Sequence, residues 1–284
     1  EYVPLAYNVL YYLFAVPFSW VFGESLFTLR IVSVLATVGI GVLIFWILSR
    51  ETGSRWWGLT GAGLFAASYR VMSCYLDTAH ADTCFVLCSL AGSAIIRYNR
   101  SRGIRLLGLA ILIASFWFKQ HGALFAIGGL LYLTWDEGWR RSWPYRLLGF
   151  VLGPVAYLAI GPILFGSHFL YFTYTVPSGW STLSLRSFAR FGGLLVGSFF
   201  WLALTAIWWF FRQFHRNTSN STIWQVQLAA AFGTALMGSL DEFSSNNVYI
   251  PFFTWLILCG VWGLHQMNGV VAGKWREIVP LTML

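Results

Sequence analysis

Apolar runs alternate with short polar segments along almost the whole chain. Ten such runs lie roughly at 5–22, 31–48, 57–72, 83–96, 106–118, 123–135, 147–165, 192–211, 224–237 and 248–264. A helix of about 17–25 apolar residues is long enough to cross the hydrocarbon core of a bilayer. Shorter runs can still enter it where their ends are buried in protein or line a cavity. The pattern therefore predicts an all-α protein, a polytopic transmembrane bundle of about 9–10 apolar segments.

Two segments are expected to lie along the membrane surface on the non-cytoplasmic side. The first, residues 1–22, contains Pro17 and is followed by Gly23, so we interpret it as an interfacial or first-loop helix. The second, residues 166–190, mixes aromatic residues with two arginines, which is typical of an amphipathic stretch. Residues 1–284 are otherwise interpreted as one transmembrane domain, and we expect the chain to be a fragment with missing spans at both ends.

The composition agrees with a membrane protein. Hydrophobic residues make up 58% of the chain and charged residues 10%, whereas about a quarter of a soluble domain is charged. The 16 tryptophans fit the aromatic belts that anchor membrane helices at the lipid headgroups. The net charge is +8, but its basic residues are scattered in short loops, which argues against nucleic acid as a partner.

The basic residues also predict an orientation. If each run from residue 31 onward crosses once, 13 of the 18 lysines and arginines face the same side, which the positive-inside rule makes cytoplasmic. Most of the other acidic residues, and three of the five histidines, then collect on the opposite face. We expect an integral membrane protein of a bacterial inner membrane, or an equivalent one, with a polar site on its non-cytoplasmic face.

Candidate functional residues occur in three polar segments of that face. Asp77, His80 and Asp82 join two runs, and they can line a cavity or ligate a divalent cation, although their spacing matches no specific metal motif. Asp82 also suits the N-terminal cap of the following helix, and this alternative stays open.

The second segment is Lys119, Gln120 and His121, between two short apolar runs. A lysine at membrane depth is costly unless it faces water, protein or an anion, and phosphate is a natural partner for an ammonium group. The alternative is an ordinary surface loop. In the third segment, Asn247 and Tyr249 are either hydrogen-bonding groups at a cavity mouth or residues that cap the last run.

Short motifs in this order resemble those of the GT-C membrane glycosyltransferases, in the branch of the protein O-mannosyltransferases and the aminoarabinose transferases of lipid A. They are Glu1-Tyr2-Val3-Pro4-Leu5-Ala6-Tyr7, Phe22-Gly23-Glu24-Ser25-Leu26-Phe27-Thr28-Leu29-Arg30, His80-Ala81-Asp82-Thr83, Phe118-Lys119-Gln120-His121-Gly122 and Asn246-Asn247-Val248-Tyr249-Ile250-Pro251.

The resemblance implies a transferase that takes a sugar from a polyprenyl-phosphate carrier. It implies a catalytic carboxylate on a loop that would precede Glu1, so that base has no number in this sequence. Glu1 matches a second acidic position, near the acceptor or an ion, and with Asp82 it is the candidate catalytic residue here. Tyr7 of the same motif is a candidate for substrate binding. Where the family has Lys-Pro-Pro this sequence has Tyr2-Val3-Pro4, and Lys119 is our candidate for the lipid phosphate.

Two other classes stay open beside the enzyme. A non-catalytic helical subunit that scaffolds a larger membrane complex would explain the altered Lys-Pro-Pro motif, and its partners would be other membrane proteins and lipids. A secondary transporter would carry broken helices near the midplane in paired repeats, and the chain shows no repeated halves. A carboxylate in the loop that would precede Glu1 favours the enzyme over both.

Overall fold

The computed structural model describes residues 8–180, 185–216, 222–241 and 244–270, and it is an all-helical fold, as predicted. The elements in chain order are α1 (Leu10–Phe22), α2 (Leu26–Thr52), α3 (Arg55–Ala67), α4 (Asp82–Tyr98), α5 (Arg102–Phe118), α6 (Gly122–Glu137), α7 (Trp143–Phe150), η1 (Val151–Ile160), α8 (Gly161–Phe165), η2 (Tyr171–Thr175), α9 (Val176–Ser178), α10 (Leu185–Ser198), α11 (Phe200–Arg216), α12 (Thr222–Ser239), η3 (Asn246–Tyr249) and α13 (Ile250–Val270). Each of the ten apolar runs coincides with one or more of these helices.

Within the described part of the chain, three helical segments are long and apolar enough to cross a membrane alone: Leu26–Thr52, Trp143–Phe165 and Asn246–Gly269. The apolar run at 192–211 is not one straight helix, because α10 and α11 meet at 92°, and this bent pair makes a fourth span if it is counted as one. Other runs form helices of 13–17 residues that pair through tight turns. Short helices of this kind are stable in lipid where protein covers their ends.

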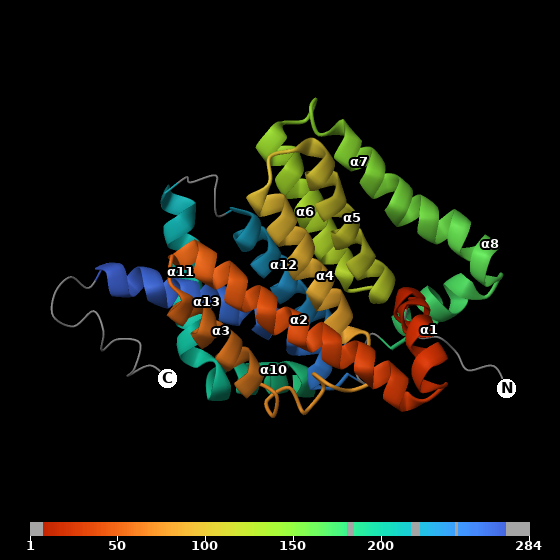
Figure 1. The fold of residues 1–284 in the computed structure, drawn as a ribbon, viewed down its shortest axis with the longest axis horizontal. Coiled ribbons are helices and arrows are strands. Elements are labelled where there is room, and N and C mark those ends of the chain that lie inside the picture. The colour runs from red at the N-terminus through yellow and green to blue at the C-terminus, as the bar shows by residue number, and fades with distance from the viewer. Residues whose placement is uncertain (1–7, 181–184, 217–221, 242–243, 271–284) are drawn as a thin grey trace.

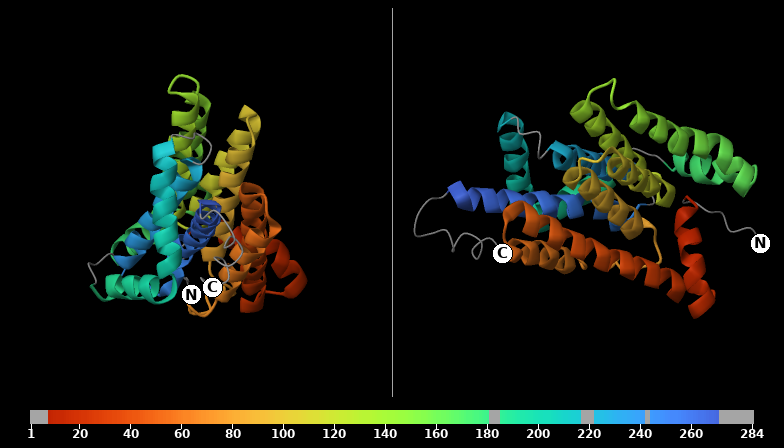
Figure 2. Two further views of the ribbon diagram at one scale, coloured as in Figure 1. Left: turned by 90° about the vertical axis from the view of Figure 1, so that its left-hand side faces the viewer. Right: turned by 45° about the horizontal axis from the view of Figure 1, so that its top comes forward.

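The central helix and the helix at the edge of the bundle differ in their surroundings. In the most apolar 18-residue stretch of the segment Asn246–Gly269, 94% of the residues are buried, and in Figure 1 α13 runs through the middle of the molecule. In the corresponding stretch of the segment Trp143–Phe165 only 11% of the residues are buried, and Figure 2 shows this segment as a rod along one edge. A helix that is apolar on all sides is stable in either place, because both a protein core and lipid solvate apolar side chains.

The helices α4, α5 and α6 form a layer, and the successive turns that connect them lie alternately at its two ends. The turns from α4 to α5 and from α6 to α7 lie at the top of Figure 1, and α10 with the segment between α3 and α4 lies at the bottom. The segment predicted to follow the membrane surface, 166–190, contains η2, α9 and the start of α10. Its position along the surface, and that of 1–22, stay predictions.

Candidate active site

Asp82 begins α4 in the interior of the protein, where its side chain is only 1% exposed. Two hydrogen bonds fix this end of α4 to α2. Ser33 Oγ donates to the His80 carbonyl oxygen at 3.0 Å, and Thr83 Oγ1 donates to the Ser33 carbonyl oxygen at 3.2 Å. An acidic residue in the first turn also complements the positive end of the helix dipole. The carboxylate is therefore held in one place by the packing of two helices.

Lys119 reaches the same carboxylate from the turn between α5 and α6. Its Nζ atom lies 2.6 Å from Asp82 Oδ1, and both side chains are buried. The Gly122 amide closes the turn by donating to the Lys119 carbonyl oxygen at 2.8 Å. A Cβ atom at Gly122 would overlap the backbone of Ser115, so only glycine lets α5 and α6 approach this closely. The close turn is what directs Lys119 towards α4.

Asn247, from η3, completes a buried cluster with Asp82 and Lys119. Its Nδ2 atom donates to Asp82 Oδ2 at 3.2 Å, so each carboxylate oxygen has a donor. Burying an ion pair costs several kcal/mol per ion, and the pair is stable only where hydrogen bonds satisfy the remaining lone pairs. An ionisable residue kept inside a membrane protein is a first indication of a functional site. The Lys119–Asp82–Asn247 cluster is therefore a candidate site, and the space that adjoins it decides its role.

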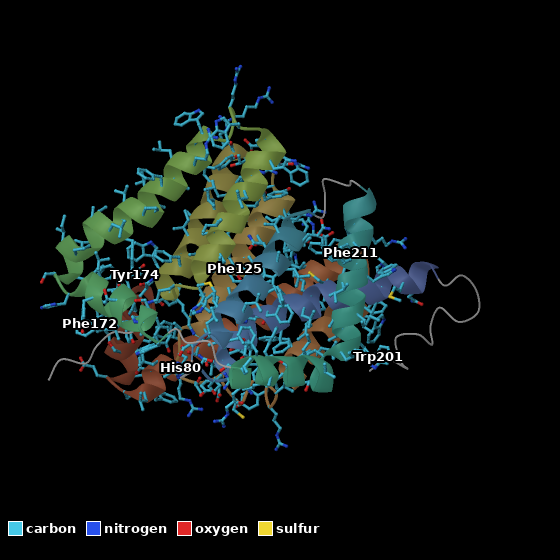
Figure 3. All side chains as sticks on the ribbon, turned by 180° about the vertical axis from the view of Figure 1, so that it is seen from behind. His80, Phe125, Phe172, Tyr174, Trp201 and Phe211 are labelled. Carbon is cyan, nitrogen blue, oxygen red and sulfur yellow. The ribbon has the colours of Figure 1, made fainter. Side chains whose placement is uncertain are left out.

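A polar cavity of about 400 Å³ adjoins this cluster. Its lining comes from the segment between α3 and α4, the α5–α6 turn, the η2–α9 region, the end of α12, and η3 with the segment that leads into it. The lining residues are Tyr75, His80, Lys119, Gln120, His121, Thr173, Tyr174, Pro177, Ser178, Trp180, Met237, Asp241, Ser244, Ser245, Asn247 and Val248. His80 and Tyr174 lie towards the same end of the molecule in Figure 3. Amides, hydroxyls and aromatic rings together suit a polyhydroxylated ligand.

An apolar groove of about 850 Å³ lies beside the polar cavity. It runs between α5, α6 and the edge helix 143–165, and residues such as Ile127, Leu130 and Leu158 line it. Gln120 and Tyr174 line both the groove and the cavity, so the two spaces share a wall. That wall is fixed by Gln120 Nε2, which donates to the Thr173 carbonyl oxygen at 2.8 Å.

The shared wall is also tied to the edge helix. The Tyr157 hydroxyl of η1 is hydrogen-bonded to Thr173 Oγ1 at 2.8 Å, and Trp117 Nε1 donates to the Leu152 carbonyl oxygen at 2.9 Å. η1 is a π-helical stretch that contains Pro154, and such stretches occur frequently at functional sites. The groove thus lies between two helices of the core, α5 and α6, and the edge helix, most of whose surface is exposed.

The two histidines of the cavity lie in turns, outside the membrane-spanning helices. Burial lowers the pKa of His121 to about 4, and the Lys119 charge contributes a smaller part of this shift. Burial also lowers the pKa of His80. Both imidazoles are therefore neutral near pH 7, and they offer the cavity hydrogen-bonding groups without adding positive charge.

The structure brings most of the sequence-predicted residues together. Asp82, Lys119 and Asn247 form the cluster, and His80, Gln120 and His121 line the cavity. The remaining four are placed elsewhere or lie outside the description. Asp77 is bonded to Arg30 and Tyr69 away from the cavity lining, Tyr249 is fully buried behind it, and Glu1 and Tyr7 fall outside the described residues.

The sequence-predicted site omits several residues of the cavity lining. They are Tyr75, Tyr174, Trp180, Asp241 and Ser244, from segments that lie between helices or in η2. Their polar or aromatic character in non-cytoplasmic segments is a signal, but nothing in the sequence shows which of them point inwards. Among the described residues, no group of three or more His, Cys, Asp or Glu side chains is arranged to hold a metal ion. A divalent cation stays a prediction.

The fold and the site define a class: a helical membrane protein in which a buried ion pair faces a polar cavity beside an apolar groove. The family model of the dolichyl-phosphate-mannose-protein mannosyltransferases matches residues 8–165, more than half of the chain. The chain belongs to this family, which confirms the resemblance and makes it a membrane glycosyltransferase of the mannosyltransferase type. The match includes Asp82 and the α5–α6 turn. No curated protein and no solved structure matches the chain.

Proposed function

We propose that this protein transfers a sugar from a polyprenyl-phosphate carrier to an acceptor at the non-cytoplasmic face of the membrane. The observation that carries the proposal is the wall that the polar cavity shares with the apolar groove. A polyprenyl-phosphate sugar has an apolar tail, an anionic phosphate and a polar sugar, so it requires two such spaces side by side. Gln120 and Tyr174 mark the boundary, where the phosphate would lie.

Lys119 is the proposed ligand of the lipid phosphate. An ammonium group is a point charge that binds phosphate oxygens without a fixed geometry. Asp82, which also accepts a hydrogen bond from Asn247, holds it at the edge of the cavity. Because Lys119 and Asn247 engage both oxygens of Asp82, we assign Asp82 to positioning rather than to proton abstraction. Tyr75 and Trp180 offer apolar ring faces with a polar edge, which suit a sugar.

The proposed reaction is a direct displacement at the anomeric carbon. The acceptor hydroxyl oxygen forms a bond to that carbon while the bond from the carbon to the phosphate oxygen breaks. The phosphate leaves with the bonding electrons, and the acceptor proton passes to a carboxylate within about 2.6–3.2 Å. By the family resemblance, this base would lie on the first external loop. Lys119 would stabilise the charge that develops on the leaving phosphate.

The distribution of arginines supports the proposed side of the membrane. Arg100 and Arg102 lie at the turn between α4 and α5, and Arg140 and Arg141 lie at the turn between α6 and α7. Both turns are at the end of the α4–α6 layer opposite to the segment that carries His80. Cationic turns favour the cytoplasmic side, so the cavity would open on the other side.

The test uses the full chain in membrane vesicles with dolichyl-phosphate mannose labelled in the sugar. We expect transfer of label to an acceptor of the membrane, with release of dolichyl phosphate as a second readout. The variant Lys119→Met with Asp82→Asn removes both charges without leaving one buried alone, and it should fold but not transfer. A wild-type protein that binds the donor without turnover would favour the scaffold subunit. Movement of a solute across the vesicle membrane without sugar transfer would favour the transporter.

A further inference from the structure

Two walls of the polar cavity come from distant parts of the chain. The segment 68–81, between α3 and α4, contributes Tyr75 and His80. The segment that leads into η3 contributes Ser244, and η3 itself contributes Asn247. The rings of Tyr75 and His80 pack edge to face with centroids 5.6 Å apart, so one of the two walls presents an aromatic pair to the cavity.

Asn246 joins these two walls. Its Nδ2 atom donates to Ser73 Oγ at 2.8 Å and to the Val71 carbonyl oxygen at 3.2 Å. Its neighbour Asn247 donates in another direction, to Asp82 in the buried cluster. The two consecutive asparagines therefore connect the segment 68–81 and the buried ion pair to a single point of the backbone.

The tip of the segment 68–81 is strained. Ser73 and Cys74 have φ angles of 52° and 62°, in the left-handed region that residues other than glycine rarely adopt. The Cys74 amide donates to the Tyr69 carbonyl oxygen at 2.9 Å, which closes the turn. A strained backbone of this kind persists only where its surroundings hold it, and it occurs preferentially at ligand clamps and active sites.

The other half of the segment is fixed by α2. Arg30 pairs with Asp77 at 2.7 Å, and the Thr37 hydroxyl donates to the Leu76 carbonyl oxygen. Residues 76–81 are thus tied to one side of the cavity, whereas Asn246 ties residues 71–73 to the opposite wall. Tyr75 lies between the two sets of contacts.

We propose that Asn246 is a positioning residue that clasps the two walls of the cavity and so sets the distance from Tyr75 and His80 to the Lys119–Asp82–Asn247 cluster. This inference rests on the proposed function, because it takes the cavity to be the binding site of the sugar donor. Asn246 is not part of the cavity lining, so it acts on the donor through the residues that it holds.

The test is the substitution Asn246→Asp in the full chain. Aspartate has nearly the same shape, but its carboxylate cannot donate to the Val71 carbonyl oxygen and repels it, so at most the contact with the Ser73 hydroxyl remains. With the clasp weakened by this repulsion, amide hydrogen exchange in residues 69–76 should become about tenfold faster, because the strained turn opens more often. The KM for dolichyl-phosphate mannose should rise about fivefold, with kcat changed less than about twofold.

The matched control is Asn99→Asp. Asn99 Nδ2 donates to the Ile95 carbonyl oxygen at 2.9 Å at the other end of α4, so its loss should change neither the exchange of residues 69–76 nor the KM. Ser73→Ala removes one of the two bonds of Asn246, and its exchange rate should lie between those of the wild type and Asn246→Asp. It also keeps the test informative if Asn246→Asp does not fold.

Unchanged exchange in Asn246→Asp would overturn the clasp. Faster exchange with an unchanged KM would overturn the positioning role, because a purely structural contact predicts that outcome. If the wild type shows no sugar transfer, the proposed function fails instead. In that case the affinity for dolichyl-phosphate mannose is measured instead of KM. A fivefold weaker affinity in Asn246→Asp would support the clasp, and an affinity equal to that of the wild type would contradict it.

Discussion

The two ends of α4 each carry buried charges, but their surroundings differ. At the C-terminal end, Glu51 Oε1 accepts hydrogen bonds from Arg97 Nε at 3.1 Å, from the Tyr98 hydroxyl at 3.0 Å and from Trp224 Nε1 at 3.0 Å. At the N-terminal end, Asp82 is held by Lys119 and Asn247. The Glu51 cluster joins α2, α4 and α12 and takes no part in the polar cavity, whereas the Asp82 cluster lies at its edge.

Arg105, near the same end of α4 as Glu51, is also a buried charge that lies away from the polar cavity. The Arg105 guanidinium donates to the Asn99 carbonyl oxygen at 3.0 Å, to Glu137 Oε1 at 2.8 Å and to Asp136 Oδ2 at 2.6 Å. Its planar group directs several donors at once to fixed acceptors, which suits a structural clamp. A lysine concentrates the same charge in one small group that can face a ligand. Burial alone therefore does not identify a site, and the adjoining cavity is what distinguishes the two clusters.

The largest expected effect separates the clusters by activity. Lys119→Ala should lower the rate of sugar transfer about 100-fold, because the leaving phosphate loses its cation. The measurement is kcat/KM with dolichyl-phosphate mannose, normalised to the amount of folded protein in the membrane. Wild-type activity in this variant would remove Lys119 from the site.

Asp82→Asn should have a smaller effect on the same reaction. The amide keeps the shape of the carboxylate but gives Lys119 a weaker partner, so we expect kcat/KM to fall about tenfold, equivalent to about 1.4 kcal/mol. Expression should stay at the wild-type level. An unchanged rate would mean that Asp82 only caps α4, which is the alternative left open by the sequence.

The groove can be tested apart from the charges. A Cβ at Gly153 would meet no atom within 4 Å, so the side chain of Gly153→Leu can extend into the groove. We expect the KM to rise about fivefold for a long-chain donor and to change little for a donor with a short isoprenoid chain. Gly63→Leu on α3 is the control, since its Cβ also meets no atom within 4 Å. Equal effects of both variants would argue against a tail in the groove.

The Glu51 cluster should affect stability rather than catalysis. Glu51→Gln leaves Arg97 without its charged partner, and we expect the free energy of unfolding to fall by about 1–3 kcal/mol. Thermal unfolding in detergent measures this, and the transfer rate per folded molecule should change less than about twofold. A tenfold loss of transfer at unchanged stability would reverse the roles assigned to the two clusters.

The effect expected to be smallest at neutral pH is a pH dependence of stability. The pKa of His121 is lowered from 6.5 to about 4 in the folded protein, so the unfolded chain binds a proton first as the pH falls. Stability should be fully present above about pH 6.5 and should decline between about 6.5 and 4. His121→Gln should make this decline shallower in thermal unfolding followed across that range. An identical slope in the variant would show that His121 does not contribute.

Several features of the fold and site were predictable because local chemistry determines them. The ten apolar runs locate the helices, and Lys119-Gln120-His121-Gly122 marks a tight turn between two of them. Asp82, Lys119 and Asn247, three polar residues of the predicted non-cytoplasmic face, meet in one hydrogen-bonded cluster, whereas Glu1 lies outside the described residues. These residues are costly in lipid when they are separated, so their positions near helix ends already favour a common polar space.

Other features depend on tertiary packing and carry no local signal. Asp77 pairs with Arg30 of α2, and Tyr249 turns away from the cavity, where its hydroxyl donates to the Ser187 carbonyl oxygen at 3.0 Å. The direction of a side chain in a loop or a short 3₁₀ turn follows from contacts with distant segments. The bend between α10 and α11 interrupts a run that is apolar throughout, so hydrophobicity alone predicts one straight helix there.

The most direct measurement is photo-crosslinking of the full chain with a polyprenyl-phosphate mannose that carries a photoreactive group in its isoprenoid tail. The tail should label groove residues such as Ile127 and Leu158, and excess unlabelled donor should prevent the labelling. Lys119→Met with Asp82→Asn should reduce it, because the phosphate loses its anchor. Labelling on the outer faces of α2 and α3 instead, or labelling that excess donor does not reduce, would contradict a donor site formed by the cavity and the groove together.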